Sequence, residues 1–149
     1  MFTQTAEYAL RAIAHLARFT DKPQTSQQIA EATRVPTPYL SKVLQQLVKG
    51  GIVSGQRGLH GGFTIAKSPT ELTIYEVIEV VDPLHRIKRC PLGIESHGSN
   101  LCPLHKSMDD AIAAVEKCFR DTTLAEILAE PSASIPLCPF PATATSDSE

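Results

Sequence analysis

Cysteine and histidine side chains gather in one stretch of the chain, CPLGIESHGSNLCPLH, which runs from Cys90 to His105. Cys90 and Cys102 are twelve residues apart, and His105 follows Cys102 at the spacing Cys-x-x-His. Thiolates and imidazoles are ligands of zinc and of iron–sulfur clusters. Two thiols can instead oxidise to a disulfide. The stretch therefore predicts a metal or cluster site or a thiol switch, within a loop interrupted by proline and glycine.

Two helices are predicted at the start of the chain. Apolar residues recur every three or four positions over Thr3–Phe19, which indicates an amphipathic helix. Thr25 and Gln28 form a capping-box pattern that opens a second, short helix, and Pro36 stops it.

A third helix and a hairpin follow. Thr37 is predicted to cap this helix with its hydroxyl, with Pro38 at the first helical position and Gly50 at the end. Its buried stripe is made of aliphatic residues at helical spacing, namely Leu40, Val43, Leu44 and Leu47. The residues at 52–66 predict a β-hairpin with a glycine-rich tip, so the whole pattern is typical of a winged helix-turn-helix.

The predicted fold class is mainly α with a small β-hairpin (α+β): a winged helix-turn-helix DNA-binding domain plus a long C-terminal dimerisation helix. That helix carries apolar residues at helical spacing: Met108, Ala111, Ile112, Val115 and Phe119. The predicted boundaries are the DNA-binding domain at 1–82 (helix-turn-helix about 25–50, wing 52–66), a sensor loop at 83–104, the dimerisation and terminal helices at 105–130, and a disordered tail rich in proline and small polar residues at 131–149.

Charge divides the chain into two unlike parts. Residues 1–67 hold eight Lys and Arg against three Asp and Glu, a net charge of +5, whereas residues 68–149 hold six against thirteen, a net charge of −7. A basic domain can approach phosphates while an acidic one stays clear of them. The partner predicted from this charge division together with the winged helix-turn-helix is double-stranded DNA, and pairing of two copies would make a near-palindromic site the expected target.

The candidate DNA contacts come from three segments. Side chains on the exposed face of the third helix can reach base edges and phosphates, the two helix starts can contact the backbone, and the wing can enter the minor groove. These residues are Tyr39, Ser41, Lys42, Gln45 and Gln46; Thr25, Ser26, Thr37 and Pro38; and Arg57, Gly58, His60 and Gly61. The alternative is a solvated polar face on a winged helix that serves as a protein adaptor.

Other protein classes lack support. The chain has no glycine-rich phosphate loop, no nucleophile elbow and no His-Glu-x-x-His motif, so an enzyme is not expected. No secretory signal or membrane-length apolar run is present, which predicts a cytoplasmic protein that does not engage the membrane.

Several stretches resemble the Rrf-two family of bacterial winged-helix regulators, which includes the IscR and NsrR types. They are TAEYALRA, TPYLSKVLQQLVKGGIVSGQRGLHGGF, TIYEVIEVVD and the cysteine loop, and the resemblance covers roughly residues 1–130. It implies a homodimeric DNA-binding repressor or activator that pairs through the 105–120 helix. Many members carry an iron–sulfur cluster in this loop.

The resemblance also supplies a ligand pattern. In IscR-like members three cysteines are evenly spaced, and a histidine follows the third at the spacing Cys-x-x-His. Here Cys90 and Cys102 match the first and third cysteines, and Ser96 stands midway between them. The implied metal ligands are Cys90, Cys102 and His105, with three weaker candidates: His97, Cys118, and Glu7, which matches a carboxylate that some members draw from the partner's first helix.

Three cofactor states stay open: a two-iron cluster, zinc, or none. The predicted protein is therefore a DNA-binding repressor whose affinity is switched by a cluster or by redox state in this loop. The alternative is a cluster-free regulator that senses through a thiol/disulfide switch or a partner protein. Cys118 is more simply an ordinary core thiol, and Cys138, in the tail, is a bystander.

Overall fold

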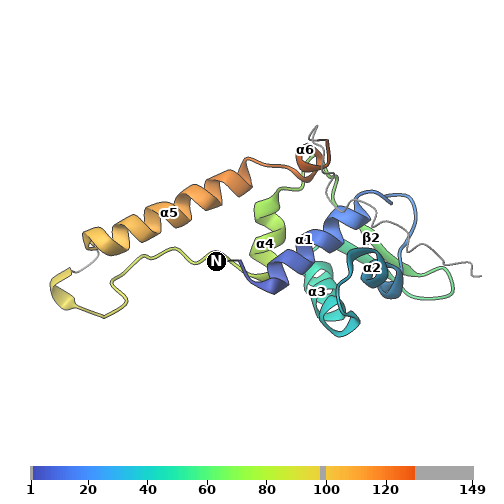
Figure 1. Cartoon of the computed structure of the whole chain (residues 1–149), viewed down its shortest axis with the longest axis horizontal. Helices are drawn as coiled ribbons and strands as arrows, with labels where there is room; N and C mark the ends of the chain where they lie inside the picture. Colours follow the sequence, from blue (N-terminus) through green and yellow to red (C-terminus); the bar gives the residue numbers. More distant parts are fainter. Residues whose placement is uncertain (1, 98–99, 130–149) are drawn as a thin grey trace, which may run out of the picture.

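A computed structural model of the chain describes residues 2–97 and 100–129. Figure 1 shows the N-terminal helices and a hairpin packed into one body, with a long helix extending from it. The elements in chain order are α1 (Gln4–Leu16), α2 (Ser26–Thr33), α3 (Thr37–Lys49), β1 (Val53–Gln56), β2 (Gly62–Ile65), α4 (Ile74–Val81), the 3₁₀ turn η1 (Glu95–His97), α5 (Pro103–Arg120) and α6 (Leu124–Ala129). The predicted tail, with Cys138, lies outside the described residues.

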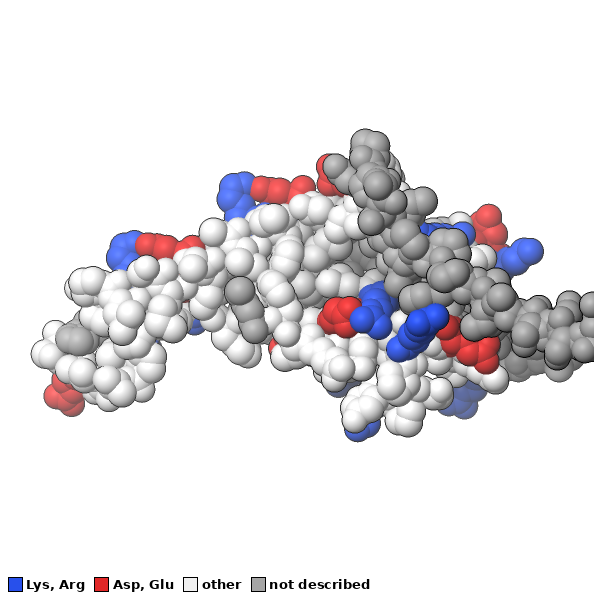
Figure 2. Space-filling model, viewed as in Figure 1, with Lys and Arg blue, Asp and Glu red and all other residues white. Residues whose placement is uncertain are grey.

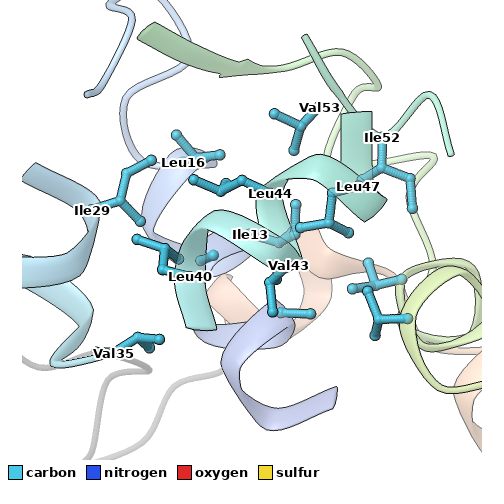
Figure 3. Packing of buried hydrophobic residues seen from close by; sticks show 14 of the residues in the cluster. Ile13, Leu16, Ile29, Val35, Leu40, Val43, Leu44, Leu47, Ile52 and Val53 are labelled. Carbon is cyan, nitrogen blue, oxygen red and sulfur yellow. The ribbon is translucent and has the colours of Figure 1, made fainter. Parts of the chain in front are cut away.

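The core is built around α3, as its apolar spacing predicted. Leu40, Leu44 and Leu47 are completely buried, and Val43 is 1% exposed. They pack against α1, α2 and the start of the hairpin (Figure 3). Because all four lie on one side of the helix, the opposite side is left to solvent.

Helix α3 begins differently from the prediction. Its N-cap is Pro36, whose carbonyl oxygen accepts hydrogen bonds from the amides of Tyr39 and Leu40, both at 3.0 Å. The hydroxyl of Thr37 makes no capping hydrogen bond. Proline at the second helical position has no amide hydrogen that needs an acceptor, so the first turn forms without a side-chain cap. The predicted capping box of α2 is confirmed, and α4 begins with a second capping box, which Thr73 forms with Glu76.

The wing is hydrogen-bonded to the connection between α1 and α2, a contact that the sequence did not predict. Strands β1 and β2 pair antiparallel, with Val53 opposite Ile65. Gln24, just before α2, exchanges two backbone hydrogen bonds with Phe63, at 2.9 and 2.7 Å. Gly62 permits this approach, because a Cβ at that position would lie 2.7 Å from the carbonyl oxygen of Gln24. The base of the wing is therefore fixed to the connection between α1 and α2.

After α5 the chain returns to the body. The amide of Leu124 donates to the carbonyl of Leu72 at 2.8 Å, and the amide of Ile74 donates to the carbonyl of Thr122 at 3.0 Å. Leu124 is 2% exposed and Leu72 is fully buried. The helix α6 thus belongs to the same core as the first four helices. Within the part of the chain that the structure describes, no helix has the length and apolarity needed to cross a membrane.

Candidate DNA-binding face and sensor loop

The polar face of α3 is displayed as the sequence predicted. Tyr39 is 58% exposed, Lys42, Gln45 and Gln46 are also exposed, and Ser41 is half-buried. The buried stripe on the other side holds the helix against the core. Amide and ammonium groups on one helix face can reach base edges and phosphates in a major groove.

A shallow groove of about 250 Å³ borders this face on the side of α1. Besides residues of α3 it is lined by Gln4, Thr5 and Tyr8. The rings of Tyr8 and Tyr39 lie 6.2 Å apart, centroid to centroid. These α1 residues could not be predicted as neighbours of α3, because tertiary packing decides which side of α1 faces α3. The polar character of the first turn of α1 was the one available signal.

The wing borders the same face on the other side. A second groove, of about 380 Å³, runs between the end of α3 and the strands, and Gln45, Lys49 and Arg57 contribute to its walls. Arg57, Gly58 and His60 are exposed at the tip. Gly61 is half-buried in the turn. The polar face of α3 therefore stands between the first turn of α1 and the wing.

The remaining predicted contacts lie at helix starts. Thr25 is exposed, and its hydroxyl oxygen accepts a hydrogen bond from the amide of Gln28 at 3.2 Å. Ser26 is half-buried, while Thr37 and Pro38 are exposed at the beginning of α3. A backbone phosphate could meet these short side chains.

The cysteine loop brings two predicted ligands together. Cys102 is the N-cap of α5 and His105 is in its first turn, and Cys102 Sγ lies 3.3 Å from His105 Nδ1. Two such ligands of one tetrahedral metal would be about 3.5 Å apart, given bond lengths of about 2.3 Å to sulfur and about 2.0 Å to nitrogen. The pair therefore fits one half of a metal or cluster site.

Neither Cys90 nor Glu7 forms a three-residue metal site with this pair, and the predicted ligand His97 lies outside the side chains that the structure describes. Cys90 is buried and Ser96 is exposed in η1. No three His, Cys, Asp or Glu residues among positions 2–97 and 100–129 come together as a metal site. Glu7 lies on α1, where its carboxylate accepts from Arg11, with 2.6 Å between the charged atoms.

Cys118 is exposed on α5, so it is not the core thiol that the sequence suggested. Together with Glu7 it lines an apolar groove of about 500 Å³ between α1, α4, α6 and the end of α5. The apolar walls of this groove are formed by Leu10, Ala14, Ile74, Phe119, Leu124 and Ile127. None of the residues of α5 is buried.

Comparison with known proteins identifies the chain. The family model named Rrf2 and described as an iron-dependent transcriptional regulator matches residues 2–130. The chain belongs to the Rrf2 family. An HTH-type transcriptional regulator of Aquifex aeolicus is 30% identical over 131 residues, which cover 86% of this chain and 91% of that protein.

Two solved structures share the fold of this Rrf2-family chain. IscR of T. potens is 22% identical and has a TM-score of 0.71, with 86% of this chain and 85% of that chain covered. CymR, the global cysteine regulator of B. subtilis, is 20% identical and has a TM-score of 0.71, with 85% and 95% covered. The predicted fold class is confirmed, and the Rrf2-family protein is a transcriptional regulator rather than an enzyme.

An extended segment connects α4 with the cysteine loop of this Rrf2-family chain and runs beside α5 (Figure 1). Arg86 donates two hydrogen bonds to Asp109 of α5, at 2.7 and 2.6 Å, and the amide of Ile87 donates to the same carboxylate at 2.8 Å. We call residues 84–90 the strap. Hydrogen bonding from Arg86 lowers the pKa of Asp109 to about 2. The hydrogen bonds that hold the strap to Asp109 are therefore fully formed at pH values above the ordinary carboxyl pKa. They are lost only as the pH falls through about 2 and Asp109 becomes protonated.

Replacing Asp109 by asparagine should speed backbone hydrogen exchange in the strap by about fivefold, because the acceptor of three donors loses its charge. Exchange measured by mass spectrometry tests this. The control is Asp110→Asn, since Asp110 pairs with Lys106 within α5, at 2.6 Å. Equal exchange rates in the two variants would mean that other contacts hold the strap.

Proposed function

We propose that this Rrf2-family chain is a cytoplasmic homodimer that represses transcription by binding a near-palindromic site in double-stranded DNA. The observation that carries the proposal is the polar face of α3, which stays exposed opposite its buried stripe and beside a glycine-rich wing. A helix presented in this way enters the major groove. The net positive charge of residues 1–67 favours the approach to phosphates.

Each DNA-facing segment takes a different part in binding. Gln45 and Gln46 would pair with adenine edges, and Lys42 would pair with a phosphate. The helix-start residues Thr25, Ser26, Thr37 and Pro38 border the DNA backbone, and Tyr39 and Ser41 complete the face of α3. In the wing, Arg57 and His60 would lie in or beside the minor groove, where Gly58 and Gly61 let the backbone approach closely.

Dimerisation would occupy the surfaces that α5 leaves open. Ion pairs run along one edge of α5, above a broad face without charged side chains (Figure 2). Leu104 is 66% exposed and Met108 is 49% exposed. An 18-residue amphipathic helix without a buried residue needs a partner to cover its apolar face. A second copy that pairs through 105–120 would cover it and would place two α3 helices on one duplex.

Direct binding measurements test the DNA-binding proposal. Protein is first used to select duplexes from a random pool, and affinity is then measured against the selected site and against random DNA. Gln45→Ala/Gln46→Ala should weaken binding to the selected site by about 100-fold and leave binding to random DNA unchanged. Lys42→Ala should weaken both and reduce the salt slope by about one.

The matched control is Lys106→Ala, which removes an exposed cation on α5 and should change neither affinity. Binding that does not depend on salt, or that never exceeds binding to random DNA, would rule out the proposal.

For the signal, we propose that Cys90, Cys102 and His105 hold a two-iron cluster that switches DNA affinity. The Sγ–Nδ1 distance of 3.3 Å in the Cys102–His105 pair supports this. Cys90 would have to leave its buried position, and Glu7 of a second copy could complete the set. Its ion pair with Arg11 is no obstacle, because a surface pair contributes at most about 1 kcal/mol. A bound cluster supplies a group whose loss changes the order of the loop.

A cluster-free thiol switch or a partner protein acting on the loop is the second candidate. The Cys102–His105 contact favours the thiol switch, because a neighbouring imidazole can stabilise a reactive thiolate. Protein purified without oxygen separates the two mechanisms. A cluster predicts colour with bound iron and sulfide, lost in Cys90→Ala/Cys102→Ala and kept in Cys118→Ala. A colourless protein that takes up no iron, but forms a Cys90–Cys102 disulfide with peroxide, supports the thiol switch instead.

A further inference from the structure

One apolar side chain stands at the tip of the wing without contacts to hold it. Leu59 is 96% exposed, whereas the next most exposed large apolar side chain among the described residues, Leu92, is 76% exposed. An exposed leucine is unremarkable on an ordinary surface. This one stands on the segment that the proposed function directs at DNA.

The backbone presents Leu59 in a defined turn. The amide of Gly61 donates to the carbonyl of Gly58 at 3.0 Å, so Leu59 and His60 occupy the two central positions of a tight turn. Gly58 has a φ of +112°. A Cβ on Gly61 would lie 2.4 Å from the carbonyl oxygen of Gln56. Glycine is therefore required at both corners, and the turn that results aims Leu59 away from the protein.

In the minor groove, A·T and G·C pairs differ by one hydrogen-bond donor, and a leucine side chain has no acceptor for it. An A·T pair shows only acceptor atoms on the groove floor, while a G·C pair adds the guanine N2 amino group. Leucine offers no acceptor, so it would strip water from that amino group and leave its hydrogens without a partner. Apolar side chains in the minor groove favour sites where nothing projects from the floor.

We propose that Leu59 enters the minor groove and rejects G·C pairs at the position that the wing tip covers. This inference rests on the proposed function, since it requires the wing to lie at the minor groove. Arg57, two residues earlier, would hold the neighbouring phosphates or line the same groove, and Leu59 would add the discrimination between base pairs. The Leu59 side chain would then add sequence specificity in the minor groove to the specificity that α3 provides in the major groove.

Inosine provides the test, because an I·C pair lacks the N2 amino group and keeps the major-groove groups of G·C. Full-length protein is titrated with three versions of its selected duplex, which carry A·T, G·C or I·C at each position flanking the half-sites. For wild-type protein, G·C should weaken binding about tenfold at the covered position, and I·C should restore it. In Leu59→Ala the three duplexes should bind within about twofold of one another.

The control is Leu92→Ala, the same chemical change at a leucine that is 76% exposed outside the wing, which should keep the wild-type ratio of G·C to I·C affinity. Leu59 is too exposed for its replacement to affect folding, which circular dichroism checks. An unchanged ratio in Leu59→Ala, or an equal loss of affinity for all three duplexes, overturns the inference while the proposed function stands. Wild-type protein without any selective DNA binding would overturn the proposed function itself.

Discussion

Replacing Leu124 by alanine should lower the free energy of unfolding by about 2–5 kcal/mol, the usual cost of a large-to-small change in a core. Leu124 is 2% exposed, and its amide donates to Leu72, which is fully buried. Loss of its side chain leaves a cavity where α6 closes the core. Urea denaturation followed by circular dichroism measures the change at the transition midpoint.

The matched control is Leu59→Ala, the same chemical change at a side chain that is 96% exposed. Its free energy of unfolding should stay within about 0.5 kcal/mol of the wild-type value. If Leu124→Ala were equally mild, α6 would not belong to the core of the DNA-binding body.

The second large effect is expected at Met108. Met108→Glu places a charge in the middle of the apolar face of α5, where 49% of the side chain is exposed. Burying an unpaired carboxylate between two helices is costly, so self-association should weaken on the order of 100-fold. Operator affinity should fall by a similar factor or more, because the two half-sites are no longer bound by one linked pair. Sedimentation velocity and operator titration measure both effects.

Ala114→Glu adds the same charge to the same helix, at an exposed position about 120° around the axis from Met108. It should leave both self-association and operator binding near their wild-type values. Dimers that persist in Met108→Glu, or that dissociate equally in Ala114→Glu, would show that α5 does not pair through its apolar face.

The local elements of this protein follow from nearby residues. The buried stripe of α3 repeats every three or four positions, so helix geometry alone places Leu40, Val43, Leu44 and Leu47 on one side. The capping boxes at Thr25 and Thr73 each involve a residue only three positions later. The hairpin at 52–66 and the family resemblance likewise rest on contiguous stretches.

Contacts between distant segments could not be predicted in this way. The pairing of Gln24 with Phe63 and of Leu72 with Leu124 joins residues 39 and 52 positions apart, and no local pattern in either partner names the other. The same holds for the groove that α1 residues line beside Tyr39. The predicted start of α3 was also wrong. The amides of the first turn donate to the carbonyl oxygen of Pro36, and the hydroxyl of Thr37 does not cap the helix.

The sequence by itself determined the presence of α3, of the wing and of the Cys102–His105 spacing. Each of these depends on residues within a few positions of one another. Tertiary structure decided which of them meet. It brings Cys102 and His105 to 3.3 Å, leaves Cys90 buried and exposes Cys118 beside an apolar groove. The physical reason is that packing against the common core sets the positions of distant segments, whereas helix and turn geometry sets only their local form.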